Sequence, residues 1–309
     1  MKKKYYRNKT AVITGAASGI GKEFAIQLTN LKVNLILSDI NLAGLKNIES
    51  ELDSFDTKII FVQCDVTKKE DVENLAAITL KEMNQVDFVF SNAGVYGIGP
   101  LEEFTHQQWE HMINVNIWGM IYVVSAFLPI MLEQEGGHVI VTSSIAGSMG
   151  SGMVTPYSTT KFANSGFCEA LYGEYKQKGL NVSVICPFPI HTHLIKGAGF
   201  SFSSDLFEKY GNKITKEAIE AGKKYYWEEF TKKGSGFLGG FNVEKSVKRF
   251  IKKISKKKLY IFDRRYGRLI QYLRGFWPSL YKLLLKISGK RHRKLVEATY
   301  DKIIEKSGI

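Results

Sequence analysis

Residues Thr10 to Gly21 read TAVITGAASGIG. Five β-prone residues lead directly into a turn with three glycines, and Phe24, Leu28 and Leu31 then recur at helical spacing. A strand, a tight turn and a helix in this order form the repeating unit of a parallel sheet, because parallel strands need a crossover connection between them. The stretch therefore predicts that the chain continues as alternating strands and helices.

The alternation does continue along the chain. Six further short apolar runs follow, separated mostly by about 15–25 residues with helical spacing. Near-continuous apolar strands alternating with helices are typical of a parallel sheet that is covered on both faces. The predicted fold is an α/β, doubly wound, mostly parallel sheet of the Rossmann type, with seven strands at residues 10–14, 33–38, 58–63, 86–91, 138–143, 181–186 and 259–262.

The domain organisation follows from where the alternation stops. The sequence has no internal repeat, no low-complexity linker and no second series of strands. We therefore expect one doubly wound domain over residues 1–262, with a basic helical extension over 263–309. Within the domain, residues 193–241 follow the sixth strand and are expected to form a lid and substrate wall.

The glycine turn points to a ligand. Gly15, Gly19 and Gly21 lie on the passage from strand to helix, where glycine lets the backbone approach a pyrophosphate. The helix N-terminus that follows offers free N–H groups and a partial positive charge. The spacing is G-x-x-x-G-x-G rather than the commoner G-x-G-x-x-G, so an ordinary glycine-rich turn is the alternative.

Two acids after the next strands favour a dinucleotide. Asp39 ends the second strand about 20 residues after the glycines, where it can accept hydrogen bonds from both ribose hydroxyls and would repel a 2′-phosphate. No Arg or Lys follows Asp39 immediately, and Ser18 in the turn is neutral, which favours NAD over NADP. Asp65, after the third strand, can face the adenine; its alternative role is a helix cap or turn acid.

The stretch TPYSTTK, Thr155 to Lys161, is a candidate for proton transfer. Thr155 is a suitable N-cap and Pro156 suits the first helical turn, so Tyr157 and Lys161 are expected at i and i+4 on one helical face. A lysine ammonium beside a phenol favours the phenolate and lowers its pKa. The alternative is an exposed aromatic ring packed on a lysine stem.

Together these motifs resemble the short-chain dehydrogenase/reductase family. The resemblance rests on TGAASGIG, CDV, SNAG, NVNIWG, SS…YSTTK and CPFPIHT, which occur in the family's order over residues 10–262. In that family a serine lies thirteen residues before the tyrosine, which selects Ser144 rather than Ser143 here. Adjacent strand-end residues point to opposite sides, so only one of these two serines should face the site.

The resemblance implies a role for each residue of the motif set. Ser144 would hydrogen-bond the substrate oxygen, Tyr157 would transfer the proton, and Lys161 would bind the nicotinamide ribose and depress the tyrosine pKa. Asn116 would hold a helix kink and a water in a proton relay; a buried Asn satisfied by backbone is the alternative. The implied cofactor contacts are Gly15, Ser18, Gly19, Ile20, Gly21, Asp39, Asp65, Val66, Asn92, Ala93, Gly94, Tyr157, Lys161, Pro187, Ile190 and Thr192.

One stretch departs from the family pattern. Where the family usually has Pro-Gly after the sixth strand, this chain has PFPIHT, with Phe188 in place of the glycine. A bulky side chain there should narrow or reshape the pocket, so Phe188 joins Ser144 and Tyr157 as an expected substrate contact. His191 and His193 are separated by one residue, but no third ligand is evident and no metal site is expected.

The expected lid is rich in aromatic residues. Such a lid suggests an apolar substrate such as a lipid, retinoid, steroid or acyl chain. The alternative is that many of these side chains pack the lid onto the core. The large apolar residues of the segment are Leu194, Ile195, Phe200, Phe202, Leu206, Phe207, Tyr210, Tyr225, Tyr226, Trp227, Phe230, Phe237 and Phe241.

Basic charge is concentrated near the C-terminus. The net charge is +13, yet residues 245–294 hold 18 Lys and Arg against one acid, Asp263. Pro278 is expected to divide an amphipathic stripe here into two helices. A basic amphipathic helix can lie on an anionic membrane surface, which makes residues 264–294 a candidate for peripheral membrane association. The stripe is Leu269, Ile270, Leu273, Phe276, Trp277, Leu280, Leu284 and Ile287.

Two alternatives remain for this segment. The stripe can pack against the domain or across a homo-oligomer, with the charges merely solvated. Nucleic-acid binding is disfavoured: the charge would suit it, but no such motif appears and the apolar stripe has no role in it.

Cysteine content and hydropathy bear on location. The three cysteines are odd in number, widely spaced and without a CxxC pair, which favours a reducing compartment. No signal-peptide-like stretch follows the basic start, and no window reaches about 18 uninterrupted apolar residues, so a membrane-spanning helix is not expected. The expected location is cytoplasmic, with peripheral membrane contact through the basic segment.

The predicted function is an NAD(P)-dependent oxidoreductase that interconverts an alcohol and a carbonyl, acting on an apolar, lipid-like substrate. The rival is a catalytically retired member that binds dinucleotide as a sensor or membrane-associated scaffold. A scaffold has no need for Asn116, Ser144, Tyr157 and Lys161 together, which argues against the rival. The sequence leaves the substrate, the direction and the oligomeric state open.

Overall fold

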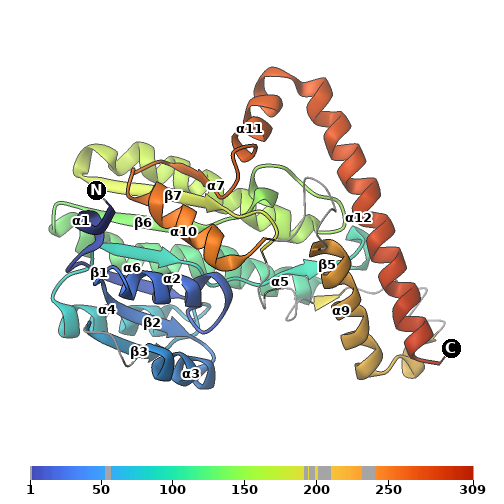
Figure 1. Cartoon of the computed structure of the whole chain (residues 1–309), viewed down its shortest axis with the longest axis horizontal. Helices are drawn as coiled ribbons and strands as arrows, with labels where there is room; N and C mark the ends of the chain where they lie inside the picture. Colours follow the sequence, from blue (N-terminus) through green and yellow to red (C-terminus); the bar gives the residue numbers. More distant parts are fainter. Residues whose placement is uncertain are drawn as a thin grey trace.

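The computed structural model describes residues 2–52, 57–190, 194, 199–200, 210–231 and 241–308. At its centre is a seven-stranded sheet in the order β3-β2-β1-β4-β6-β7-β9, with all neighbours parallel. This confirms the predicted doubly wound sheet (Figure 1). The strands are β1 Thr10–Thr14, β2 Asn34–Asp39, β3 Ile59–Gln63, β4 Phe88–Ser91, β6 Gly137–Thr142, β7 Leu180–Cys186 and β9 Tyr260–Phe262.

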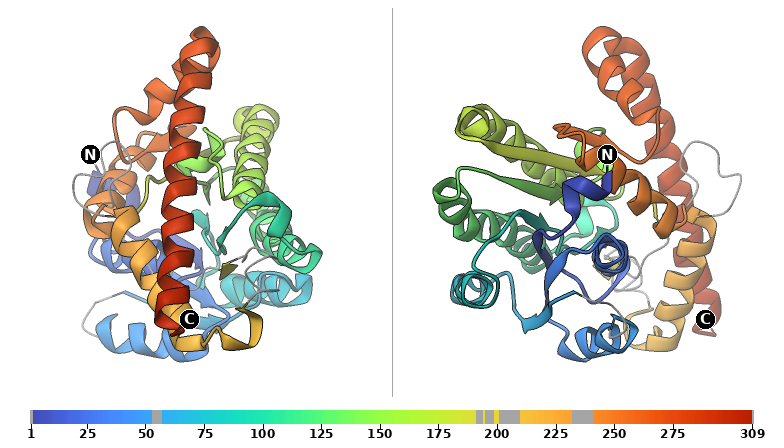
Figure 2. Two further views of the ribbon diagram at one scale, coloured as in Figure 1. Left: turned by 90° about the vertical axis from the view of Figure 1, so that its right-hand side faces the viewer. Right: turned by 60° about the vertical axis from the view of Figure 1, so that its left-hand side comes forward.

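Helices cover both faces of this sheet (Figures 1 and 2). Alternate residues of β1 enter different cores: Val12 lies in the cluster with α4, α6 and α7, whereas Ala11 and Ile13 lie in the cluster with α2, α3 and α10. Both faces of the strand are therefore buried, which explains its continuous apolar sequence. The helices are α1 Lys2–Tyr6, α2 Gly19–Thr29, α3 Leu42–Leu52, α4 Lys69–Met83, α5 His106–Ile113, α6 Gly119–Glu133, α7 Thr155–Tyr175, α9 Lys216–Thr231, α10 Val243–Ile254, α11 Gly267–Phe276 and α12 Pro278–Lys306.

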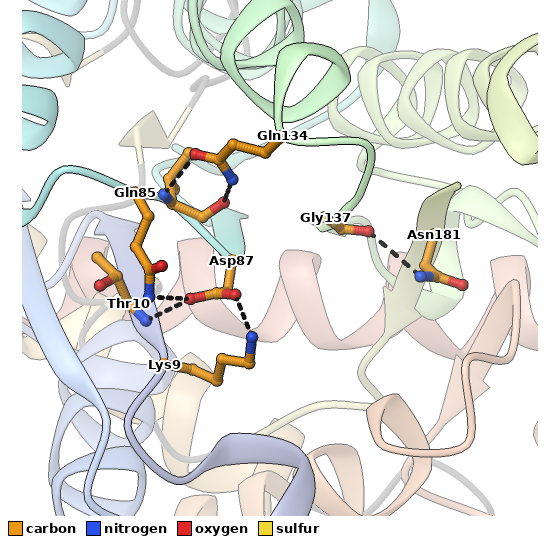
Figure 3. Close-up of polar contacts among 8 residues, drawn as sticks. Lys9, Thr10, Gln85, Asp87, Gln134, Gly137 and Asn181 are labelled. Carbon is orange, nitrogen blue, oxygen red and sulfur yellow. Dashed lines mark hydrogen bonds and ion pairs between the residues drawn. The ribbon is translucent and has the colours of Figure 1, made fainter. Parts of the chain in front are cut away.

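Polar side chains clamp the amino ends of the central strands (Figure 3). Asp87 accepts hydrogen bonds from Lys9 Nζ at 2.7 Å and from the Thr10 amide at 2.8 Å. The Gln134 side chain pairs with both backbone groups of Val86. Because Val86 bonds to this amide, β4 begins at Phe88 rather than at residue 86, where the sequence pattern placed it.

The segment between β4 and β6 is one nearly continuous helical run. α5 and α6 are joined by a π-helical turn, Asn114–Trp118, and the run His106–Glu133 is long and apolar enough to cross a membrane by length and composition alone. Met120, Val123 and Phe127 of α6 are buried in the sheet's core, which identifies it as a core helix. A two-residue parallel pair, β5 Gly97–Ile98 with β8 Gly199–Phe200, lies outside the main sheet and was not predicted.

The C-terminal extension forms helices, as expected. α11 ends at Phe276 and α12 begins at Pro278, so the predicted break at this proline is confirmed. The second half of α12 runs beside α9, while α11 and the start of α12 project from the body (Figures 1 and 2). α9 and α12 pack closely at Gly222 of α9, where an added Cβ would lie 2.3 Å from Cγ1 of Ile303 in α12.

Candidate active site

The carboxyl ends of the strands open into a cavity of about 740 Å³. It lies where the strand order reverses between β1 and β4, the usual ligand position in an open α/β sheet. One side, the strand-end wall, consists of the loops after β1, β2, β3, β4, β6 and β7. The predicted residues that line it are Gly15, Ser18, Gly19, Ile20, Asp39, Asp65, Val66, Asn92, Ala93, Gly94, Ser144, Tyr157, Lys161, Pro187, Phe188 and Ile190.

Backbone geometry explains the three glycines of the turn. Gly15 and Gly19 have φ of +65° and +55°, in the left-handed region that disfavours other residues. Gly21 is needed for packing instead, because an added Cβ would lie 2.1 Å from the Gly15 carbonyl oxygen. Ser18 precedes α2 without a side-chain capping bond, so its hydroxyl leaves the first-turn amides to a ligand.

The loop after β4 fixes this turn in place. Asn92 Nδ2 donates to the carbonyls of Thr14 and Gly15 at 3.1 and 3.2 Å, and its Oδ1 accepts from Thr142 Oγ1 at 3.0 Å. At Gly94 an added Cβ would lie 3.1 Å from Asn116 Oδ1 and 3.3 Å from Lys161 Nζ. A side chain at position 94 would therefore fill the space above the loop after β4. Without one, the backbone there can lie against a flat ring such as that of a nicotinamide.

The two predicted acids are held by backbone amides. Asp39 accepts from the amides of Ala17 and Asn41, both at 2.9 Å, which fixes its carboxylate beside the glycine turn. Asp65 Oδ1 accepts from the amide and the hydroxyl of Thr67, at 3.0 and 2.8 Å, so it is the turn acid that was one of its two expected roles. Both residues also line the cavity.

The two serines after β6 point in different directions. Ser143 Oγ donates to the Lys161 carbonyl at 2.8 Å and is buried against α7. Ser144 instead lines the cavity, as Tyr157 does, and its Oγ accepts from the Ala146 amide at 3.1 Å. Ser144 and Tyr157 therefore meet at the cavity.

Tyr157 and Lys161 lie in the first turns of α7. The helix begins at Thr155 with Val154 at the N-cap position, one residue earlier than predicted, so Thr155 is not the cap. Lys161 is buried, with its Nζ 5.6 Å from the centre of the Tyr157 ring and donating to the Thr142 carbonyl at 3.0 Å. The alternative of an exposed aromatic ring is excluded, because only 6% of Tyr157 is accessible to solvent.

The expected lowering of the phenol pKa is wrong for this structure. Burial raises the pKa of Tyr157 to about 12, and the opposing group is Ser144 through its hydrogen bond. Burial lowers the pKa of Lys161 to about 8. The reason is that both charged forms lose their hydration in the enclosed site, and the ammonium is directed at a carbonyl rather than at the phenol oxygen.

Asn116 lies behind the cavity in the π-helical turn. Its side chain accepts from the Val95 amide at 2.8 Å and donates to the Val95 carbonyl and Thr160 Oγ1, both at 3.0 Å. The side chain is therefore satisfied within the protein and ties the β4 loop to α7. Its role in a proton relay stays a prediction.

Phe188 lines the cavity, but only 1% of the residue is accessible to solvent. Its ring packs edge-on against Tyr266, with ring centres 4.9 Å apart, and its amide donates to Asp263 Oδ1 at 3.2 Å. The bulky side chain thus anchors the segment between β9 and α11 instead of forming open cavity surface. Its predicted contact with substrate remains untested.

Three predicted features fall outside the described residues. Thr192, expected near the nicotinamide, and the two histidines His191 and His193 are among them, as is much of the aromatic lid. Among the residues that the structure describes, no group of three or more His, Cys, Asp or Glu is arranged to hold a metal ion.

The opposite side of the cavity is the helical wall. Its α9 part belongs to the segment 193–241 that was expected to form a lid and substrate wall, whereas its α12 part was missed by the sequence reasoning. The wall is formed by Glu229 and Phe230 of α9 and by Ser288, Arg291, His292 and Leu295 of α12. His292 is buried; its Nε2 hydrogen-bonds Tyr226 of α9 and its Nδ1 lies 3.2 Å from Ser151 Oγ.

Further contacts connect His292 to Tyr157. Tyr226 also hydrogen-bonds Tyr96, whose ring meets the edge of Tyr157 with centres 4.6 Å apart. Burial lowers the pKa of His292 to about 4, so it is neutral around pH 7. A signal existed, because His292 shares helical spacing with the buried Val296, Thr299 and Ile303, beyond the end of the predicted stripe.

Comparison with known proteins agrees with this geometry. The profile of the short chain dehydrogenase family matches residues 9–199. This chain belongs to the short-chain dehydrogenase family. An uncharacterized oxidoreductase of Listeria monocytogenes is 32% identical over 220 residues, which cover 71% of this chain and 85% of the relative. A diacetyl reductase, (S)-acetoin forming, of Staphylococcus epidermidis is 33% identical over 181 residues, 58% of this chain and 70% of the relative.

A solved structure gives the same result. A short-chain dehydrogenase/reductase from Burkholderia phymatum in complex with NAD superposes with a TM-score of 0.74 at 26% identity, covering 89% of this chain and 96% of its own. Membership of the family makes the protein an NAD(P)-dependent oxidoreductase, and the family's sequence match ends before the helical wall begins.

Proposed function

We infer that the protein interconverts an alcohol and a carbonyl compound, with NAD as the preferred cofactor and an apolar molecule as the substrate. The observation that carries this proposal is that Ser144 and Tyr157 both line the cavity, with Lys161 Nζ 5.6 Å from the centre of the tyrosine ring. A hydroxyl and a phenol converging on one point can hold and protonate a single oxygen atom, which is what carbonyl reduction needs.

Each residue has a distinct task. Bound along the strand-end wall, a nicotinamide cofactor supplies or accepts the hydride. Ser144 positions the substrate oxygen, and Tyr157 gives or takes its proton. With a pKa of about 12, the phenol is protonated at pH 7 and set to donate, so reduction is favoured near neutrality and oxidation gains as the pH rises. Lys161 holds the ribose side of the site and places a cation near the phenol.

The preference for NAD rests on charge. The Asp39 carboxylate is fixed beside the turn that would hold the adenosine half, and it would repel a 2′-phosphate. The cationic residues among the described lining are Lys161, at the catalytic end, and Arg291, on the helical wall. Neither belongs to the glycine turn or to the loop after β2.

The apolar character of the substrate rests on the side chains around Tyr157. Ile145, Met149, Val154, Phe230 and Leu295 line the same cavity as Tyr157. A volume of about 740 Å³ leaves room for an extended apolar molecule beside a cofactor, within the range of ordinary ligand pockets. Diacetyl, the substrate in a relative's name, is small, so chain length is the property to vary.

The deciding experiment is Tyr157→Phe, assayed with NADH against a series of ketones from diacetyl to long-chain species. Turnover should fall by about 100-fold or more, because general acid catalysis contributes that much, while NADH affinity stays within about twofold. Tyr175→Phe, at the far end of the same helix, is the matched control and should keep full activity.

Two results would count against the proposal. Equal turnover by Tyr157→Phe would remove the tyrosine from the chemistry. Wild-type protein that binds NADH but turns over no alcohol or ketone in a broad panel would favour the retired dinucleotide sensor.

A further inference from the structure

Among the residues that the structure describes, the most exposed apolar surface lies at the turn between α11 and α12. Of the thirteen large hydrophobic side chains that are exposed in the described part of the chain, seven fall between residues 269 and 287. Phe276 and Trp277 at the apex are 85% and 64% exposed. Clustered exposure of this kind marks an interaction surface, unlike single exposed apolar residues. We call these seven the apical patch: Leu269, Tyr272, Phe276, Trp277, Leu280, Leu283 and Ile287.

The apical patch follows the helical period. Residues 269, 272 and 276 form one stripe on α11, and residues 280, 283 and 287 form another on α12, since side chains three and four apart share a face. Figures 1 and 2 show this turn projecting away from the sheet and its covering helices. The patch is therefore presented at the end of an arm, where a flat surface can reach it without meeting the body.

The surrounding charge is of one sign. Residues 264–294 contain no acid and ten basic residues: Arg264, Arg265, Arg268, Arg274, Lys282, Lys286, Lys290, Arg291, Arg293 and Lys294. Eight of these, all except Arg264 and Arg274, are exposed and have no ring contact in the structure. On α12 the stripe of residues 280, 283 and 287 continues into Lys290, Arg291 and Lys294, so one face passes from apolar to cationic away from the apex.

The passage from an apolar apex to a cationic face indicates which partner binds the apical patch. A second copy of the chain would bring an equally positive surface to the patch, and like charges would repel. An anionic lipid surface accepts the apolar apex among its acyl chains and the cations among its headgroups, with Trp277 at a depth that tryptophan favours. Each cation near such a surface contributes about 1 kcal/mol of binding free energy. Stable binding needs two contributions together, here the insertion of apolar side chains and the attraction of the cations to anionic headgroups.

We propose that the apical patch and the cations beneath it dock this protein on membranes that contain anionic phospholipid. The proposal is a surface contact: α11 has ten residues, too few to span a bilayer, and the start of α12 is interrupted by Lys282, Lys286 and Lys290.

Docking in this way sets the position of the active-site cavity. Ser288 and Arg291, on the helical wall, lie about 12 and about 17 Å along α12 from Leu280, at a rise of 1.5 Å per residue. The cationic part of the helix at headgroup depth is thus also the part that borders the cavity. An apolar substrate dissolved in the membrane would have a short path to Tyr157.

The test is sedimentation of the full chain with vesicles of phosphatidylcholine containing 30 mol% phosphatidylserine, compared with pure phosphatidylcholine, at low and high salt. Wild-type protein should bind the anionic vesicles, and pure phosphatidylcholine or high salt should weaken binding several-fold. Phe276→Ser with Trp277→Ser should reduce binding about tenfold or more, as should Lys286→Gln with Lys290→Gln. Trp118→Ser, which removes a 47% exposed tryptophan from the π-helical turn before α6, is the matched control and should bind as wild type.

All these positions are exposed, so thermal melting should change little and loss of binding would not reflect unfolding. Failure of wild-type protein to bind anionic vesicles, or equal binding by the Phe276/Trp277 variant, would overturn the proposal. A wild-type dimer that becomes monomeric in that variant, with no vesicle binding, would assign the patch to a second copy. None of these readouts depends on catalysis, so they stand apart from the test of the proposed function.

Discussion

The strand-end wall and the helical wall face each other across one cavity but are built from different kinds of sequence. The first is a series of short motifs, each at the end of a strand, such as the turn from Gly15 to Gly21. The second is assembled from side chains far apart in the chain: Tyr226 and His292 are 66 residues apart, and Ser151 and His292 are 141 apart. Local backbone geometry determines the first wall, and helix packing determines the second.

The difference extends to burial and charge. The strand-end wall holds its functional polar groups inside the protein, with Lys161 only 3% exposed. The α12 arm keeps its lysines in solvent and its apolar apex uncovered. Changes in the strand-end wall should therefore affect cofactor binding and folding, whereas changes in the helical wall should affect substrate handling.

The largest effect is expected from Gly21→Ala. Its Cβ would lie 2.1 Å from the Gly15 carbonyl oxygen, so the turn must shift and its amides would no longer face a pyrophosphate. NADH affinity should fall about 100-fold or more, as measured by fluorescence titration.

The matched control lies in α11, far from the glycine turn. Gly275→Ala in α11 has nothing within 4 Å of its new Cβ, so cofactor affinity should not change and the helix should be stabilised by up to about 1 kcal/mol. Similar losses of NADH affinity in both variants would show that the strand-end wall is not specially constrained.

The sequence predicts the strand-end wall well because its determinants are local. A glycine turn after an apolar strand requires a left-handed backbone wherever it occurs, and Tyr157 and Lys161 share a face in any α-helix. The bounds of β4 were less certain, because the side chain of Gln134, 48 residues away, bonds to Val86 in place of a neighbouring strand.

What the sequence cannot supply is burial. The pKa of Tyr157 was expected to fall because Lys161 stands nearby, yet burial dominates and raises it. His292 was not selected because its position at the cavity depends on which face of α12 meets α9, and that depends on how the two helices pack. Phe188 was placed correctly at the cavity, but its ring is taken up by Tyr266, a contact that no local pattern indicates.

The second prediction concerns the cost of a buried charge. Lys161 has a pKa of about 8 in the folded protein, against 10.5 ordinarily. At a pH between the two pKa values, the unfolded chain binds more protons than the folded protein, so the free energy of unfolding rises with pH. From pH 7 to pH 9.5 this lysine should contribute about 2 kcal/mol to the rise. Lys161→Met should lose that pH dependence, as measured by denaturant unfolding at both pH values. Lys290→Met, at an exposed position of α12, should keep the pH dependence of the wild type. If both variants showed the same pH dependence of unfolding, the low pKa assigned to buried Lys161 would be wrong.

The third prediction tests cofactor choice. Asp39→Asn keeps an oxygen that can accept from one of the two backbone amides but removes the negative charge. NADH affinity should fall about tenfold, roughly 1.4 kcal/mol, while NADPH affinity should hold or improve. Fluorescence titration with both cofactors measures the ratio. Wild-type protein that binds NADPH more tightly than NADH would refute the proposed preference.

The smallest effect is expected at the helical wall. His292→Leu keeps a similar volume but removes the ring nitrogen that hydrogen-bonds Tyr226 and the contact with Ser151, so α12 should hold less firmly to α9 beside the cavity. The KM of a carbonyl substrate should rise about fivefold, with kcat and NADH affinity within about twofold, and the melting temperature should fall by a few degrees. His292→Gln, which restores a hydrogen-bonding group, should recover part of the loss. Because the pKa of His292 is about 4, its removal should leave the pH profile between 6 and 9 unchanged. If NADH affinity fell as much as KM rose, the two walls would not be separable, and the division of cofactor and substrate between them would fail.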